Sequence, residues 1–322
     1  MKPVMRNLPP KFVWISLGVE GGINESNLNA YLLAPYQSSD FICLDAGTLF
    51  AGLQVAANNG CFHDIPMQDQ PDQCVESVVL KSHVKAYLIS HSFLDHLHGL
   101  VSVSPNDTPK PIIGLPETID GIRDSIFNWV SWPNMGNEGK NPVGQYQYQR
   151  LSEGRRTPIE NTSMHVEALS LAHSNSADSA AFLIDHDGHY VLYMGDTGPD
   201  EVEQRTTTED LWKRIAPLIR ENRLHMITIE ASFVDSHPEE LLFGHLTPKW
   251  ILKSFRKLAL MVEPNQPQQA LAGLKVVIAH IKPCLLASKP DNTRQIIEQQ
   301  LASHNDLGIH FILVSQGTRL EF

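Results

Sequence analysis

The stretch AYLISHSFLDHLHGLVSVSP, residues 86–105, decides how this chain of 322 residues is interpreted. An apolar run ends at Ser90, and His91, Asp95 and His96 follow directly after it. Imidazole and carboxylate groups together are typical ligands of zinc, manganese or iron. The stretch therefore predicts a metal-binding loop at the end of a β-strand.

The same arrangement, a polar side chain directly after an apolar run, recurs along the chain. The side chains concerned are Asp45, His91, His173, Asp196 and His280. Taken alone, an Asp before Ala-Gly is more often a turn residue, and a lone His is more often a satisfied core or surface group. Their joint occurrence predicts that they lie along one edge of a core, where a rigid scaffold holds ligands in place.

β-Branched and aromatic runs bounded by turn residues predict strands, and helical patterns lie between some of them. Strands are expected at 12–18, 29–35, 41–46, 84–90, 111–115, 164–172, 180–185, 189–194, 225–231, 274–280 and 310–315. Helices are expected at 48–57, 71–82, 94–103, 117–127, 209–222, 248–261 and 291–303. Asp291 or Asn292 is the expected N-cap of the last helix. This order predicts an α/β sandwich of two mixed β-sheets with helices outside.

We expect a single domain over residues 1–322 with a loop insertion at about 128–150. The loop is rich in Asn, Gly and Pro and contains Trp129 and Trp132. A loop of this length is usually functional or part of a partner contact. Two readings stay open: the indole rings stack on a substrate base, or they pack against the protein body or in a homodimer.

Composition argues against several classes of function. The net charge of −11 is unlike that of proteins that bind a nucleic-acid backbone. No apolar run approaches the roughly 18 residues of a membrane span. The four cysteines have no C-x-x-C spacing that would indicate a thiolate zinc site. The chain as it stands predicts a cytoplasmic protein, and a periplasmic protein lacking its signal peptide would look the same.

The run HSFLDHLHGLVSVSP (91–105) resembles the His-x-His-x-Asp-His signature of the metallo-β-lactamase superfamily. It is more closely similar to the class II cyclic-nucleotide phosphodiesterase branch. Other stretches similar to that branch are GGINESN (21–27), LDAGT (44–48), MGDTGPD (194–200), FGHLTP (243–248) and IAHIKP (278–283). The resemblance covers about residues 15–285 and implies a four-layer αββα sandwich of two mixed β-sheets.

The resemblance implies hydrolysis of 3′,5′-cyclic nucleotides, cAMP or cGMP, to nucleoside 5′-monophosphates by a metal-activated hydroxide. Two metal ions are expected, Zn²⁺ or else Mn²⁺ or Fe²⁺. The implied ligands are His91 and His173 for the first ion, Asp95, His96 and His280 for the second, and Asp196 between them. Asp45 would not bind a metal itself but would orient a ligand histidine.

The leaving ribose oxygen needs a proton, so a general acid is expected. The candidate is His245, oriented by Glu230, and tRNA 3′-processing nucleases look similar here. With Asp95, these two form the expected catalytic set. The alternative reading of His245 is a loop histidine that caps the helix beginning near Thr247. Asn175 is a further candidate for contact with the substrate.

Phe93 stands where the family has its second histidine, and its ring cannot bind a metal. The first site is then left with His91, His173 and Asp196, and we expect a metal content nearer one than two per chain. His98, three residues after Asp95, is a candidate substitute ligand. Two further functions stay open: another phosphodiesterase or nuclease of the superfamily, and a nucleotide-binding protein whose catalysis Phe93 has impaired.

Overall fold

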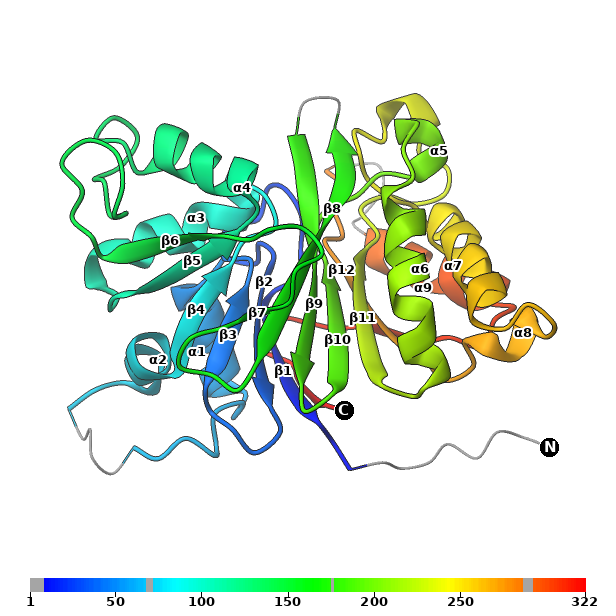
Figure 1. Cartoon of the computed structure of the whole chain (residues 1–322), viewed down its shortest axis with the longest axis horizontal. Coiled ribbons are helices and arrows are strands. Elements are labelled where there is room, and N and C mark those ends of the chain that lie inside the picture. Colours follow the sequence, from blue (N-terminus) through cyan, green and yellow to red (C-terminus); the bar gives the residue numbers. More distant parts are fainter. Residues whose placement is uncertain (1–8, 68–71, 175–176, 286–291) are drawn as a thin grey trace.

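Two mixed β-sheets lie face to face in the middle of the molecule, and helices cover their outer faces (Figure 1). The structure is a computed structural model that describes residues 9–67, 72–174, 177–285 and 292–322. The layers follow the order helix, sheet, sheet, helix. This confirms the α/β, four-layer αββα sandwich that the sequence predicted.

The first sheet has the strand order β14-β1-β2-β3-β4-β5-β6. Its strands are β1 (Phe12–Gly18), β2 (Ala30–Pro35), β3 (Phe41–Leu44), β4 (Val84–Leu88), β5 (Lys110–Gly114), β6 (Tyr146–Arg150) and β14 (Arg319–Glu321). β1, β2 and β3 pair antiparallel, and β3, β4, β5 and β6 pair parallel. β1 and β2 are buried along their whole length because both faces of the sheet are covered.

The second sheet has the strand order β13-β12-β11-β10-β9-β8-β7. Its strands are β7 (Thr157–Pro158), β8 (His165–Ser174), β9 (Ala177–His186), β10 (His189–Met194), β11 (Leu224–Glu230), β12 (Lys275–Ala279) and β13 (His310–Leu313). β10 to β13 pair parallel, while β7 to β10 pair antiparallel. Each sheet thus has a parallel half and an antiparallel half.

Helices from the first half of the chain cover the first sheet, and later helices cover the second (Figure 1). The first group is α1 (Phe50–Asn58), α2 (Val75–Val78), α3 (Leu94–Val103) and α4 (Pro116–Gly121). The second is α5 (Asp200–Glu203), α6 (Thr207–Arg220), α7 (Pro248–Val262), α8 (Pro267–Ala270) and α9 (Thr293–His304). Short π- or 3-10-helical turns are η1 (Val79–His83), η2 (Ser104–Asn106), η3 (Ile122–Ile126) and η4 (Glu239–Leu241).

Three apolar cores hold these layers together. The central core fills the space between the sheets and contains the fully buried rings of Trp14, Tyr31 and Tyr193. Each sheet has a second core beneath its helices. On the second sheet, the rings of Trp212 from α6 and Phe255 from α7 stack with their centroids 5.5 Å apart. Both helices bury one apolar stripe and leave charged residues outside, as expected for surface helices.

The carboxyl ends of the parallel strands form one edge of the sandwich. β3 and β4 end there in the first sheet, and β10, β11 and β12 end there in the second. β8 runs in the same direction as β10, because it is related to that strand by two antiparallel pairings. Ligands of α/β sheets bind outside the carboxyl ends of parallel strands. This edge therefore carries the polar side chains that follow these strands.

Each predicted strand and helix has a counterpart, but the sequence missed several short elements. β6 occupies the end of the predicted loop 128–150: its sequence YQYQR is polar because the strand lies at a sheet edge, with Tyr146 buried. β14 pairs with β1 from the other end of the chain, a contact that no local pattern signals. Asn292 stands at the N-cap of α9 without a side-chain capping bond, and Asp291 lies outside the described residues.

Candidate metal centre

Asp196, two residues after the end of β10, lies at the centre of four buried histidines. The distances from its Oδ2 atom are 3.2 Å to His280 Nε2, 3.3 Å to His96 Nε2, 3.9 Å to His91 Nε2 and 4.0 Å to His173 Nε2. Two ligand atoms on one tetrahedral zinc ion lie about 3.3 Å apart. The spacing around Asp196 therefore matches a set of metal ligands.

The outer ring nitrogen of each of these histidines has a hydrogen-bond partner behind it. The Nδ1 partners are Ser90 Oγ for His91 at 3.1 Å, Asp45 Oδ2 for His96 at 2.7 Å, Gly244 O for His173 at 2.9 Å and Ser232 Oγ for His280 at 3.0 Å. Both serine hydroxyls donate their own hydrogen to a carboxylate, Asp45 or Glu230, so they accept from the imidazole. The partners thus assign the proton to Nδ1 and leave the inner Nε2 lone pair free.

The inner nitrogens lack protein partners that would suit them. His91 Nε2 is buried without any hydrogen bond. His96 Nε2 and His280 Nε2 face each other at 3.2 Å, which brings two lone pairs together. A buried acceptor without a donor is costly, and a cation between these nitrogens would remove that cost. The donor set of this site therefore fits a metal ion.

The structure brings together all six predicted ligands. His91, His96 and Asp196 have ligand atoms within 4.8 Å of one another, as do Asp95, His96 and His280. The two groups share His96 and meet at Asp196. A third group joins His173 and Asp196 to His245. The predicted catalytic pair Glu230 and His245 forms a fourth group with His280, so it borders the same centre.

The carboxylates give this centre a strong affinity for positive charge. Burial tends to lower the pKa of His96, but Asp196 and Asp45 outweigh it and raise that pKa well above its usual value. Burial lowers the pKa of His91 and His173, so both are neutral. Burial favours a raised pKa for Asp95, but the His280 imidazole beside it holds that pKa far below the usual range. The carboxylates therefore favour a positive charge at His96 Nε2, which is a second proton in the free protein and a metal ion when one is bound.

Asp45 is fully buried and holds His96 in place. Its carboxylate accepts hydrogen bonds from the Ser90 backbone N–H at 2.7 Å, the Ser90 hydroxyl at 2.8 Å and the Tyr193 hydroxyl at 2.5 Å. Its backbone has a positive φ of 50°, which turns the chain sharply after β3. Tyr193 comes from the second sheet, so the position of a ligand histidine depends on both sheets.

The GGINESN stretch (residues 21–27) contacts two of the predicted ligands, Asp95 and His280. The Gly22 N–H lies 3.4 Å from Asp95 Oδ2, and Gly21 packs against the His280 ring so closely that a Cβ would lie 2.4 Å from it. Asn24 and Asn27 donate to the two carboxylate oxygens of Glu20 at 3.0 and 2.9 Å, which fixes the loop. Glycine is required at position 21 because its backbone approaches the His280 ring directly, and it is favoured at position 22 because the φ there is 90°.

His245 lies between the carboxylate of Glu230 and the ammonium group of Lys282. Its Nδ1 atom is 2.8 Å from Glu230 Oε1, and its Nε2 atom is 2.9 Å from Lys282 Nζ. Burial tends to lower the pKa of His245, but the charge of Glu230 raises it above its usual value. The N-cap of α7 is Thr247. The geometry thus favours the paired reading of His245 over the capping reading.

Phe93 stands beside the first pair of histidines. Its ring centroid lies 4.8 Å from that of His91 and 5.4 Å from that of His173, and 42% of the residue is exposed. A histidine at position 93 would direct its ring toward His91 and His173, as Phe93 does. His98 is exposed on α3 and belongs to none of the ligand groups found among the described residues. The compensation proposed for His98 is therefore not supported, because the helix turns it to solvent.

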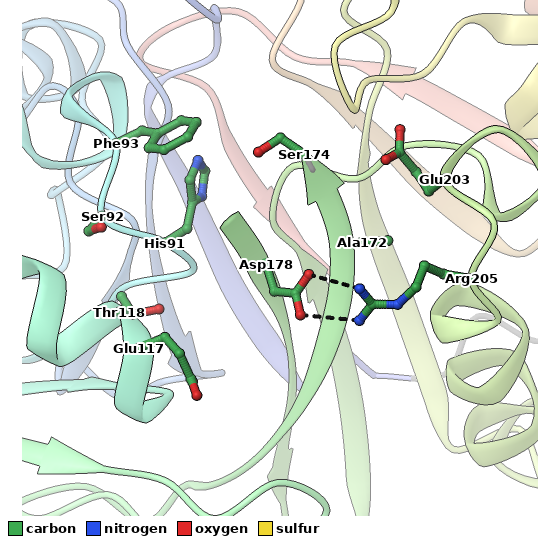
Figure 2. A pocket seen from close by; sticks show the side chains of 10 residues that line it. All are labelled: His91, Ser92, Phe93, Glu117, Thr118, Ala172, Ser174, Asp178, Glu203 and Arg205. Atoms are coloured by element: carbon green, nitrogen blue, oxygen red, sulfur yellow. Dashed lines mark hydrogen bonds and ion pairs between the residues drawn. The ribbon is translucent and has the colours of Figure 1, made fainter. Parts of the chain in front are cut away.

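A cavity of about 540 Å³ opens at the His91 end of the centre (Figure 2). Its lining includes His91, Phe93, Glu117, Ser174, Asp178 and Arg205. Across the cavity, the Arg205 guanidinium forms an ion pair with Asp178 at 3.1 Å (Figure 2). No local pattern signals this pair, since Asp178 lies on β9 and Arg205 follows α5.

The predicted base-stacking tryptophans do not line this cavity. Trp129 is half exposed, and its indole N–H lies 3.0 Å from the Lys140 carbonyl within its own loop. Trp132 packs on the core of the first sheet and donates to Ser104 Oγ at 3.0 Å. These contacts favour the alternative reading, in which both rings pack within the loop or against the protein body. Asn175 lies outside the described residues.

Sequence reasoning missed the residues that support the ligands. Ser90, Ser232 and Lys282 each lie within two residues of a predicted ligand or catalytic residue, which is a signal that could have been used. Gly244, directly before His245, carried the same signal, whereas Tyr193 did not. Gly244 has a φ of 76° and directs its carbonyl to His173, and only glycine fits because a Cβ would collide with the His173 carbonyl.

Comparison with known proteins agrees with this geometry. A family model described as cAMP phosphodiesterases class-II matches residues 11–317. A 3′,5′-cyclic-nucleotide phosphodiesterase of Aliivibrio fischeri is 39% identical over 312 residues, covering 97% of this chain and 93% of the relative.

Solved structures share the fold. Unliganded yeast PDE1 matches with a TM-score of 0.85 at 20% identity, over 97% of this chain and all of the other. The metallo-β-lactamase fold protein YhfI from Bacillus subtilis matches with a TM-score of 0.61 at 13% identity, over 96% and 99% of the two chains. None of the helices in the described residues is both long and apolar enough to cross a membrane.

Proposed function

This chain belongs to the class-II cAMP phosphodiesterase family, and from that premise we propose that it hydrolyses 3′,5′-cyclic nucleotides to nucleoside 5′-monophosphates. One observation carries the assignment. Four buried histidines point their free Nε2 atoms at Asp196, beside a cavity large enough for a nucleotide. This arrangement suits a hydrolase that uses a metal ion.

We propose zinc as the metal, with manganese or iron as alternatives, because imidazole and carboxylate ligands suit all three. Asp95, His96, Asp196 and His280 would hold one ion. His91 and His173, with Asp196, would hold a second ion only weakly, since Phe93 offers no ligand. A bound ion supplies Lewis acidity and lowers the pKa of a coordinated water. We therefore expect a metal content nearer one than two per chain.

The remaining groups position the reaction. Asp45 and Ser232 hold the ligand rings through their Nδ1 atoms. His245 donates its Nδ1 proton to Glu230, whose charge favours a second proton on Nε2 once the Lys282 ammonium group no longer donates to that atom. From Nε2, His245 would protonate the ribose 3′-oxygen as its bond to phosphorus breaks. The cavity beside His91 would then receive the nucleoside part of the substrate.

A second candidate function rests on Phe93. Its ring occupies the place beside His91 and His173 where the family has a ligand, so the protein could bind cyclic nucleotides with little turnover. The overall acidity argues against a third possibility, a nuclease acting on RNA.

The test is to incubate the protein with cAMP, cGMP and a single-stranded RNA in the presence of zinc or manganese. We expect 5′-AMP or 5′-GMP by chromatography, loss of activity with a chelator, and no RNA cleavage. Asp196→Asn is the control, since it keeps the shape but removes the central charge, and it should be inactive. Binding of cyclic nucleotide without product at saturating metal would favour the second function. RNA cleavage would contradict both.

A further inference from the structure

Lys282 brings a positive charge to the edge of the metal centre. It follows β12 two residues after His280, and its Nζ atom lies 2.9 Å from His245 Nε2. Two further contacts hold it. Its backbone N–H donates to the Ser232 carbonyl at 3.2 Å, and its ammonium group lies over the Phe233 ring at 5.5 Å. The side chain is partly buried, so contacts within the protein restrict its position.

The hydrogen-bond partner of this ammonium group is an imidazole, although several carboxylates lie in the same centre. The centre contains the carboxylates of Asp45, Asp95, Asp196 and Glu230, yet within the described ranges no carboxylate lies within 4.0 Å of Lys282 Nζ. Arg205, the cation on the cavity wall, is by contrast paired with Asp178. Among the described residues, Lys282 Nζ donates one N–H, to His245 Nε2, which leaves two of its three donors for other groups. Its charge is therefore available to an anion from outside the chain.

We propose that Lys282 binds a non-bridging oxygen of the phosphate group of the nucleotide. The proposal rests on the proposed function for the identity of the anion. One imidazole ring separates Lys282 Nζ from Asp196: His245 Nδ1 lies 3.8 Å from Asp196 Oδ2 while its Nε2 meets the lysine. A phosphate above Asp196 is therefore within the reach of a flexible lysine side chain. Lysine binds phosphate as a compact point charge.

The same contact gives Lys282 a second consequence. In the absence of substrate its ammonium group donates to His245 Nε2, the atom that would face the leaving oxygen. When phosphate takes up the ammonium group, Nε2 is released. Substrate binding would thus expose the nitrogen that the reaction needs, without movement of the backbone. Lys282 would act both as a phosphate ligand and as a cover for His245.

The test measures binding of two probes, AMP and adenosine, to the metal-loaded protein by calorimetry. A hydrogen bond to a charged group is worth about 1.5–3 kcal/mol, so Lys282→Met should weaken AMP binding by about ten- to a hundredfold. Adenosine binding should not change, because the nucleoside has no phosphate. Lys282→Arg should retain most of the AMP affinity. Lys249→Met is the matched control: this exposed lysine on α7 is paired with Glu239, and its loss should alter neither affinity.

Elemental analysis of each variant separates an effect on phosphate from an effect on the metal. Lys282→Gln keeps an N–H donor for His245 but no charge, and it decides the matter if the Met variant does not fold. Equal AMP affinity in wild type and in either uncharged variant would overturn the proposal, as would parallel losses for AMP and adenosine. AMP binding needs no turnover. A protein that fails to hydrolyse cyclic nucleotides but loses AMP affinity on Lys282→Gln would overturn the proposed function and leave this assignment intact.

Discussion

At the scale of single residues, the ring orientations of the histidines matter more than their number. The chain has 15 histidines, and four of them turn Nε2 toward Asp196 because a partner behind each ring holds Nδ1. Orientation of this kind raises metal affinity, since the ring loses no freedom on binding. Phe93 interrupts the pattern at one point only, and its ring still lies against His91 and His173.

Phe93→His should restore a ligand to the first site. Because the ring at this position lies beside two ligand histidines, we expect the zinc content to rise from near one toward two per chain. The turnover number for cyclic nucleotide should rise with it. Elemental analysis and initial rates at saturating zinc measure both quantities. Phe93→Leu is the control and should leave the metal content unchanged. Two zinc ions in the wild-type chain would contradict the reading of Phe93 as a lost ligand.

At the scale of elements, α3 carries Asp95 and His96 to the centre, and its place is fixed by close packing on the loop after β3. The N–H of Gly99 donates to the Gly47 carbonyl, and the N–H of Leu100 donates to the Ala46 carbonyl. A Cβ at Gly99 would lie 2.5 Å from Leu49 N and 2.8 Å from Ala46 O. These are backbone atoms that cannot move aside, so the helix itself would have to shift.

Gly99→Ala tests this packing. Helix propensity alone would stabilise the variant by about 1 kcal/mol, but overpacking typically costs about 1–3 kcal/mol, and the rigid contacts decide the sign. We expect a lower free energy of unfolding together with weaker zinc binding, because the shift moves Asp95 and His96. Denaturant titration and zinc competition measure these. Ser102→Ala, on the exposed side of the same helix, should change neither. A more stable Gly99 variant would show that α3 packs less tightly than described.

At the scale of the whole molecule, the centre joins the two sheets. Asp45, His91 and His96 follow strands of the first sheet, while Asp196 and His280 follow strands of the second. The Tyr193 hydroxyl crosses between the sheets to reach Asp45, and Asn29 Nδ2 donates to the same hydroxyl at 2.7 Å. A metal ion bound here would therefore stabilise the packing of one sheet on the other. The organisation of residues 1–322 as a single domain stays a prediction that agrees with this picture.

Metal removal should accordingly lower the stability of the entire fold. A ligand at a hundredfold excess over its Kd stabilises the native state by about 2.7 kcal/mol. For a chain of this length we expect the midpoint of thermal unfolding to fall by several degrees when zinc is chelated. Calorimetry with and without chelator measures the shift. Asp196→Asn should unfold at a temperature that no longer depends on the chelator. If the midpoint of thermal unfolding of the wild-type protein does not change with the chelator, the ion does not bridge the sheets.

Much of the site could be predicted because its residues sit in strong local contexts. An apolar strand that ends in His or Asp is visible in the sequence, and the carboxyl ends of parallel strands meet at one edge whatever the detailed packing. The same reasoning does not extend to Trp129 and Trp132. Their spacing in a long loop carries no information about where the loop folds, and their indole groups are satisfied within the loop and by Ser104.

The sequence by itself determined the alternation of strands and helices, the polar residues that follow the strands, and the presence at position 93 of a phenylalanine, whose ring cannot bind a metal. These are local properties, set by side-chain periodicity and by the chemistry of single residues. Only the tertiary structure decided which atoms meet: Tyr193 with Asp45, Lys282 with His245, and Arg205 with Asp178. Such contacts join distant segments and depend on how the two sheets pack, to within about 1 Å. No local sequence pattern encodes packing at that precision.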